Sequence, residues 1–205
     1  HCTNCSCSIS SQDYLQRAIE FTQKNGAVFI LDEMVTGFKV DLPGAMSKYK
    51  LTPDLATWGK GIANGFSFCA LTGKKEIMDL GGILDEGNEK VFLISTTHGG
   101  ETNAIRAGIK TIQEFKEKNV IEHIYSVGNE LIKKVKALII QKQVEEFIEV
   151  IPCPWMPTFI FKNKEGKACN GHRTYFLQEM IEENILFQGI VVPSLSFTKI
   201  EVNEF

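Results

Sequence analysis

The sequence lacks any long hydrophobic run. Its longest uninterrupted apolar stretches include residues 27–31 and 91–94, with five and four residues, whereas a helix needs about 20 apolar residues to cross a bilayer. A secretory signal needs a basic start and an apolar stretch of about 7–15 residues, and the opening HCTNCSCSISSQD has neither. We therefore expect no membrane association and a cytoplasmic location.

The chain also lacks an excess of positive charge. Its 22 Lys and Arg against 25 Asp and Glu leave a formal net charge of −3 across 205 residues. Nucleic-acid-binding modules usually carry a basic face that neutralises phosphates, so no nucleic-acid partner is expected. The hydrophobic fraction of 43%, with 10% aromatic residues, is too high for a disordered chain, and this length suits one or two globular domains.

The chain also lacks the second cysteine pair that a structural zinc site needs. Cys2 and Cys5 form a C-x-x-C motif, but no second pair follows it at the spacing that a structural zinc site needs. We expect no metal, and we interpret residues 1–10 as an unstructured start with reduced thiols. Because the chain begins with His1 rather than Met, we expect it to be processed or to be a piece of a longer protein.

The hydrophobic pattern that is present predicts an α/β fold. Apolar residues recur at helical spacing over 11–25, and the unbroken apolar run 27–31 then predicts a strand buried on both faces of a mostly parallel sheet. A change from β-α-β units to an α+β pattern predicts a large domain over 11–120 and a smaller C-terminal domain over 121–205, with the boundary near residue 120 or within the helix that follows. The other elements expected are strands at 55–58, 66–71, 91–94, 147–151 and 158–161, helices at 102–118, 120–142 and 172–183, and a β-like stretch at 185–192.

Two adjacent carboxylates, Asp32 and Glu33, follow the first predicted strand. Open α/β sheets bind ligands at the carboxyl ends of their strands, so a functional role is favoured there. One interpretation is the Walker-B-like acidic strand end of a nucleotide hydrolase. That interpretation requires a G-x-x-x-x-G-K-[ST] loop, and the nearby pair Gly59-Lys60 does not fit the pattern. A hydrolase would therefore need its phosphate loop outside this sequence.

Three segments in order carry a second interpretation: LDEMVTGFKV, TPDLATWGKGIANG and LISTTHGGET. Together they resemble the class III pyridoxal-phosphate-dependent aminotransferases of fold type I and, within that family, the glutamate-1-semialdehyde aminomutase group. The resemblance implies the second half of the large cofactor-binding domain followed by most of the small C-terminal α+β domain. Family members also have an earlier segment with a Gly-rich phosphate-binding turn and a ring-stacking aromatic residue, for which this sequence has no counterpart.

The resemblance implies roles for four residues. Lys60 matches the lysine that binds the cofactor aldehyde covalently, and Asp32 matches the acid that keeps the pyridine nitrogen protonated. Met34 would pack near the cofactor ring. Thr97 matches a threonine that contacts the cofactor phosphate of the neighbouring subunit, which implies a homodimer with shared active sites.

Neighbouring residues receive structural roles. Glu33 is expected to be a turn or supporting polar residue, and His98 a packing residue. Thr102 is expected to cap the helix that follows it. Lys74 and Lys75 lack the sequence context of Lys60 and are interpreted as solvated surface charges.

The function that the resemblance implies is pyridoxal-phosphate-dependent transfer of an amino group, by an aminomutase or an aminotransferase acting on a small amino acid or amino aldehyde. A nucleotide hydrolase and a catalytically silent chain stay open as alternatives. The 205-residue chain by itself is expected to be inactive, because the family's earlier phosphate-binding segment has no counterpart in it.

Overall fold

The computed structural model describes residues 12–82 and 97–205. The expected unstructured start at 1–10 and the expected strand at 91–94 lie outside the described residues. The chain divides between Ile121 and Glu122 into two compact units. Within the described ranges no helix is long and apolar enough to cross a membrane.

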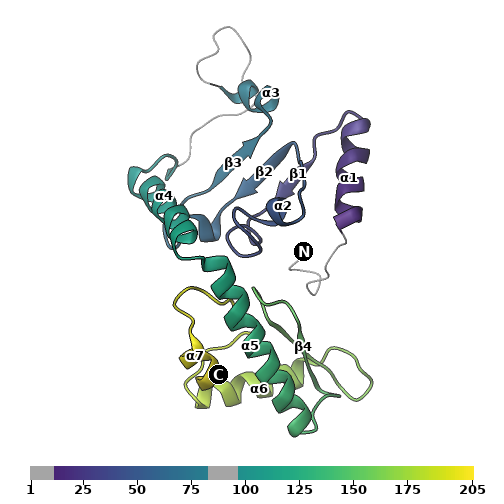
Figure 1. The fold of residues 1–205 in the computed structure, drawn as a ribbon. Coiled ribbons are helices and arrows are strands. Elements are labelled where there is room, and N and C mark those ends of the chain that lie inside the picture. Colours follow the sequence, from purple (N-terminus) through teal and green to yellow (C-terminus); the bar gives the residue numbers. More distant parts are fainter. Residues whose placement is uncertain (1–11, 83–96) are drawn as a thin grey trace. The chain divides into compact units, whose positions relative to one another are not determined.

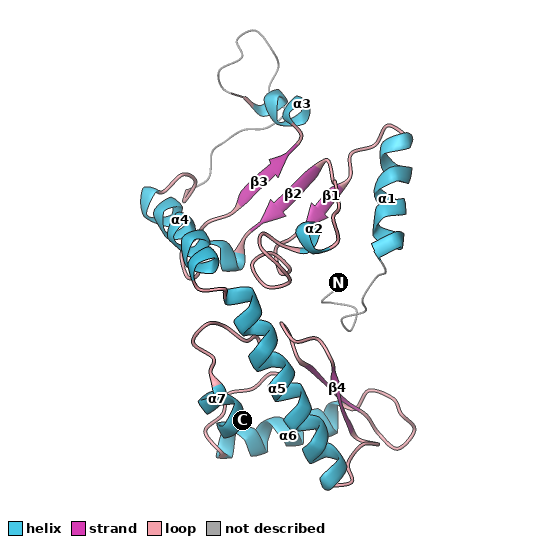
Figure 2. Ribbon diagram, in the orientation of Figure 1, coloured by secondary structure: helices cyan, strands magenta, loops and turns pink. Residues whose placement is uncertain are grey.

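The first unit has α/β architecture (Figures 1 and 2). Its strands form one sheet in the order β1-β2-β3, with β1 parallel to β2 and β2 antiparallel to β3. The elements are α1 (Gln12–Lys24), β1 (Ile30–Asp32), α2 (Ala45–Lys48), β2 (Leu55–Trp58), the 3-10 turn η1 (Lys60–Ile62), β3 (Ala70–Gly73), α3 (Lys75–Met78), the 3-10 turn η2 (Asp79–Gly81) and α4 (Thr102–Glu117).

The strand connections explain this mixture of pairings. Parallel neighbours need a long crossover, whereas antiparallel neighbours can be joined more directly. The crossover from β1 to β2 runs through residues 33–54 and includes α2, while β2 turns back into β3 through residues 59–69. The α/β class is therefore as predicted, but the described sheet is half parallel and half antiparallel rather than mostly parallel.

The prediction that the 27–31 run is buried on both faces is wrong. The strand is shorter, and Val28 and Ile30 have 50% and 56% of their surface exposed. β1 is an edge strand with β2 on one side only, and among the described residues nothing covers the face that carries Ile30. The opposite face is half-buried at Leu31 and continues into Ala56 of β2, which is buried.

The core of the first unit lies directly beneath the carboxyl ends of β1 and β2. Phe38, from the turn after β1, packs edge-on against Trp58 at 6.3 Å and against Phe115 of α4 at 5.5 Å between ring centroids. This core therefore ties the segments that follow both parallel strands to α4. Its buried members are Phe38, Ala56, Trp58, Ile62 and Ala63.

The second unit is an α+β assembly. Its elements are α5 (Val120–Gln141), which begins at the boundary, β4 (Ile148–Ile151), β5 (Thr158–Phe161), α6 (Asn170–Glu182) and α7 (Lys199–Glu204). β4 and β5 pair antiparallel, and α5 runs beside this pair (Figure 2). The buried residues are Val127, Leu131, Ile132, Val135, Val150, Phe159, Phe161, Phe187, Val191 and Val202.

The β-like stretch at 185–192 does not form a strand. It meets β5 only through a single bridge between Thr158 and Ile190. Two backbone hydrogen bonds flank that bridge, from Phe159 N to the Gly189 carbonyl and from Val191 N to the Pro157 carbonyl. Gly189 has a φ of +90°, a conformation that interrupts the regular pleat needed for a strand.

Candidate functional site

Asp32 and Lys60 lie at one edge of the sheet. Asp32 is the last residue of β1, and Lys60 follows the last residue of β2 by two positions. Because β1 and β2 are parallel, with Asp32 opposite Thr57 in the register, both residues fall at the carboxyl ends of neighbouring strands. Open α/β sheets place their ligands at this edge. Both side chains are exposed.

The Asp32 carboxylate is held in place by two hydrogen bonds to the same oxygen. Met34 N donates to Asp32 Oδ1 at 2.9 Å, and Thr57 Oγ1 donates to it at 3.2 Å. No hydrogen bond from the described residues reaches Oδ2. The carboxylate is thus oriented across the two strands with one oxygen available to a ligand. The sequence analysis missed Thr57, whose place opposite Asp32 appears only with the strand register.

Met34 lies over the residue that precedes Lys60. A methyl group added at Gly59 would come within 2.3 Å of the Met34 Cε atom and 2.8 Å of its Sδ atom. The φ of Gly59, −172°, can be adopted by any residue. A side chain at this position is therefore excluded by a clash with the Met34 thioether and not by the backbone conformation. The structure therefore brings Met34 to the same edge as Asp32 and Lys60.

Glu33 points away from this edge and is fully buried, at 1% exposure. Its carboxylate accepts hydrogen bonds from Ala45 N at 3.0 Å, from Met46 N at 2.6 Å and from the Thr36 hydroxyl. Its partners Ala45 and Met46 open α2. Because Glu33 is committed to backbone N–H groups, Asp32 and Glu33 do not form a joint cation site, which removes the main support for the Walker-B interpretation.

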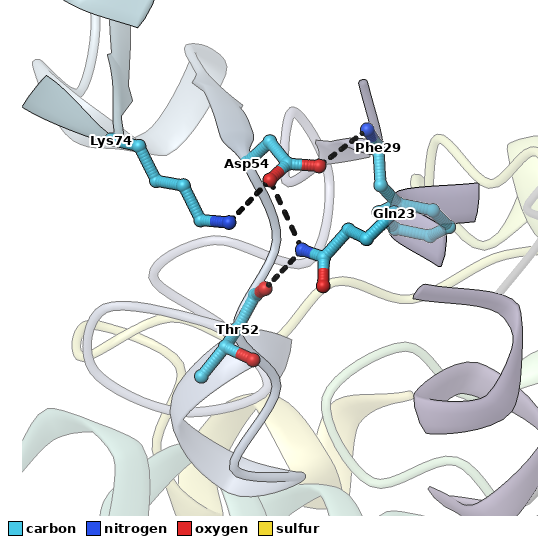
Figure 3. Close-up of polar contacts among 5 residues, drawn as sticks. All are labelled: Gln23, Phe29, Thr52, Asp54 and Lys74. Carbon is cyan, nitrogen blue, oxygen red and sulfur yellow. Dashed lines mark hydrogen bonds and ion pairs between the residues drawn. The ribbon is translucent and has the colours of Figure 1, made fainter. Parts of the chain in front are cut away.

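Asp54 anchors the opposite, amino-terminal end of the parallel strands (Figure 3). It is 5% exposed and accepts hydrogen bonds from Phe29 N at 2.8 Å and Gln23 Nε2 at 3.0 Å. Lys74 Nζ lies 2.6 Å from its Oδ1. Lys74 is exposed at the surface, as predicted, with 42% of its side chain accessible, but it also pairs with a buried acid that no local sequence pattern could place beside it.

These contacts shift the pKa values of both Asp54 and Lys74. The hydrogen bond from Lys74, followed by that from the Phe29 backbone, holds the pKa of Asp54 below its ordinary value. The bond to Asp54 raises the pKa of Lys74. A lowered carboxyl pKa stabilises the fold above the unfolded-state value near 4, and that stabilisation is lost as the pH falls through the folded-state value.

We expect Asp54→Asn to destabilise the first unit by about 1–3 kcal/mol at neutral pH, the usual cost of disrupting a buried, charge-assisted hydrogen-bond network. Urea unfolding of wild type and variant across pH 3–8 measures the effect, and the difference should shrink below about pH 4. Asp13→Asn is the matched control, because Asp13 is exposed in its pair with Arg17. Equal stability of Asp54→Asn and wild type at neutral pH would contradict this account.

Thr97 lies on an exposed turn, Thr97–Gly100, just before α4. None of the hydrogen bonds or ion pairs of the described ranges joins it to Asp32 or Lys60. The prediction that Thr102 caps α4 is off by one residue: Glu101 occupies the N-cap, and Thr102 is the first helical residue. His98 does not pack as expected, since it is exposed and its Nδ1 lies 2.8 Å from Glu101 Oε1.

Comparison with known proteins shows which family the chain resembles. Residues 4–163 match the aminotransferase class-III family. The chain is 31% identical over 175 residues to a 3-aminobutyryl-CoA aminotransferase of Cloacimonas acidaminovorans, covering 85% of this chain and 40% of that protein. It is 31% identical over 193 residues to a glutamate-1-semialdehyde 2,1-aminomutase of Sulfurisphaera tokodaii, covering 94% of this chain and 45% of that protein.

Solved structures show the same fold. A structure described as a transaminase with PLP bound superposes with a TM-score of 0.83 at 18% identity, covering 96% of this chain and 46% of the other. The chain thus spans somewhat less than half the length of the relatives that it matches. With a family match over most of its length and the fold of a transaminase, this chain belongs to the class-III aminotransferase family.

Proposed function

We propose that the chain carries the reactive lysine and the ring-facing acid of a pyridoxal-phosphate-dependent enzyme that transfers an amino group. The observation that carries this proposal is the meeting of Asp32 and Lys60 at the carboxyl ends of two adjacent parallel strands. Family membership supports it, as does the bound PLP named for a transaminase of the same fold.

The residues present suit this cofactor chemically. Lys60 is exposed and has no ion-pair or hydrogen-bond partner among the described residues, so its amine is available to an aldehyde. Asp32 has one carboxylate oxygen fixed by Met34 and Thr57 and the other uncommitted. An oriented carboxylate of this kind can hold a pyridinium N–H, because an opposite charge stabilises the protonated ring nitrogen.

The division of labour follows from these groups. Bound pyridoxal phosphate supplies an electron sink for a carbanion at the substrate carbon. Lys60 would bind the cofactor through its amine and, when released, move a proton at the substrate carbon as a general base and acid. Asp32 would keep the ring nitrogen charged, and Met34 would present an apolar surface beside the lysine.

The proposed substrate is a small amino acid or amino aldehyde. The relatives named as aminotransferase and aminomutase differ in whether the amino group leaves the substrate molecule or moves within it, and in this proposal Lys60 and Asp32 would serve either reaction. We also propose that the enzyme is a homodimer in which the exposed Thr97 turn of one subunit serves the partner's site. The exposed position of that turn, just before α4, supports this arrangement.

The test of the proposed function is to locate the covalent attachment. Purified protein is incubated with pyridoxal phosphate, reduced with borohydride and digested, and the peptides are mapped. We expect the pyridoxyl group on Lys60 in preference to other lysines, and no specific label in Lys60→Ala. The exposed Lys74 and Lys75 provide the comparison within the same digest. Preferential label on either of them would refute the assignment of Lys60.

A further inference from the structure

Lys39 and Lys60 are brought together by two chain segments that contact each other. A methyl group added at Gly61 would lie 3.6 Å from the Phe38 Cβ atom and 3.9 Å from the Gly37 carbonyl oxygen. The residues next to the two lysines therefore lie close together. Phe38 is also 5% exposed and packed into the core, so the turn that carries Lys39 is fixed against the segment that carries Lys60.

The backbone turns sharply at both places. Phe38 has a φ of +59° and Lys60 a φ of +49°. This left-handed conformation is unfavourable for a residue with a side chain, and such residues persist where the surrounding packing imposes them. The aromatic contacts of Phe38 with Trp58 and Phe115 supply that packing. The approach of the two lysines is thus built into the core of the unit.

The two lysines form an uncompensated positive pair. Lys39 is half-buried, and burial, together with the positive charge of Lys60, lowers the pKa of Lys39. Neither lysine has an ion-pair or hydrogen-bond partner in the described part of the chain. Buried or partly buried charges are normally paired, so this arrangement is incomplete without an anion.

The carboxylates on neighbouring segments form no ion pair with either lysine among the described residues. Glu33 binds the start of α2, Asp41 accepts from Leu42 N at 2.8 Å, and Asp32 accepts from Met34 N and the Thr57 hydroxyl through Oδ1, which leaves Oδ2 uncommitted. On its other side, η1 meets α4 at Gly108, where a methyl group would lie 3.6 Å from the Ile62 carbonyl oxygen. That contact is uncharged, so α4 brings no acidic side chain to the pair at this point.

We propose that Lys39 and Lys60 form a two-lysine anion site, in which Lys39 holds the acidic group of an incoming ligand beside the amine of Lys60. The ligand class is a small molecule with a phosphate or carboxylate group, because an ammonium binds either as a point charge through charge-assisted hydrogen bonds. This inference deepens the proposed function by adding Lys39 as a binding residue of the same site.

The first test compares an anionic with a neutral aldehyde. Lys60 is labelled with pyridoxal phosphate or pyridoxal, reduced, and quantified against the exposed Lys142 peptide of the same digest. We expect the preference for the phosphate-bearing aldehyde to fall about tenfold in Lys39→Gln, as suits the loss of one charge-assisted hydrogen bond, and to survive in Lys39→Arg. Lys116→Gln, at an exposed position of α4, is the control and should leave the preference unchanged.

Two results of that comparison would overturn the anion site. One is an unchanged preference in Lys39→Gln. The other is an equal loss of labelling by both aldehydes, which would mean that Lys39 acts only on the fold or on the reactivity of Lys60. Circular dichroism of Lys39→Gln checks the fold in either case.

A second test does not depend on cofactor chemistry, so it separates failure of this site from failure of the proposed function. Acetic anhydride, a neutral reagent, acylates Lys60 in the presence of inorganic phosphate or of succinate. Protection by phosphate in wild type but not in Lys39→Gln supports a phosphate ligand, and the same result with succinate supports an acidic substrate. Protection by neither anion overturns the proposal even if pyridoxal phosphate labels Lys60.

Discussion

Asp32→Asn is expected to keep the cofactor lysine reactive while lowering the rate of amino transfer by about a hundredfold or more. Asparagine has nearly the same shape and can still accept hydrogen bonds from Met34 N and the Thr57 hydroxyl, which fix Asp32 at 2.9 and 3.2 Å. What it loses is the negative charge that would stabilise a protonated ring nitrogen. Removing one preorganised electrostatic contact of this type commonly costs several kcal/mol in the transition state.

The measurement pairs two readouts on the whole protein. Borohydride mapping of Lys60 reports covalent binding, which should persist, and steady-state turnover of an amino substrate reports catalysis, which should fall. Asp41→Asn is the control, because Asp41 lies on the next turn and, among the described residues, its Oδ1 accepts only from its neighbour's backbone, Leu42 N. Near-normal turnover of Asp32→Asn would show that Asp32 does not serve the ring nitrogen.

Local periodicity predicted the long helices well. The helices expected at 102–118 and 120–142 are present at Thr102–Glu117 and Val120–Gln141. An amphipathic pattern sustained over several turns is a property of the segment itself, so it needs no knowledge of the partner against which the helix packs. The N-cap of α4 was misassigned because the sequence allows the helix to begin after either Glu101 or Thr102. Only the backbone angles decide which of the two residues is the N-cap.

Properties set by distant partners could not be predicted in the same way. Lys74 and Lys75 are neighbours in sequence, yet Lys74 pairs with the buried Asp54 whereas Lys75 pairs with Asp79, which directly follows α3. Burial of β1 was predicted from its unbroken apolar run, but burial depends on which other elements cover a strand. In this chain β2 pairs with one edge of β1 and the other edge has no strand beside it among the described residues.

The candidate site shows the same division between local and tertiary information. The motifs around Asp32 and Lys60 assigned both residues to one site by resemblance, and the parallel register of β1 and β2 shows that both lie at the same edge of the sheet. Asp32 is exposed and Glu33 is buried because successive side chains at a strand end point to opposite faces of the sheet. The approach of Lys39 to Lys60, however, needs the packing of Phe38 against Trp58 and Phe115, which no short motif contains.

A mixture of two inactive variants is expected to regain activity if the Thr97 turn serves a neighbouring subunit. In a Lys60→Ala homodimer neither site has the reactive lysine, and in a Thr97→Ala homodimer neither site has the threonine. In the heterodimer, one site then receives both defects and the other receives neither. Random association of equal amounts makes half of the dimers mixed, each with one intact site, so about a quarter of wild-type activity should return.

The alternative, in which Thr97 serves the site of its own chain, gives the opposite result. Each chain then carries one defect into its own site, so a Lys60→Ala chain mixed with a Thr97→Ala chain has no intact site and the mixture stays as impaired as its components. Coexpression of the whole protein with two different affinity tags isolates the heterodimer for the assay, and a doubly tagged Lys60→Ala homodimer is the control for activity contributed by tags or handling. Thr97 is exposed and is not joined to Lys60 by any hydrogen bond of the described residues, so recovery in the heterodimer would establish that a second subunit brings the threonine to the site.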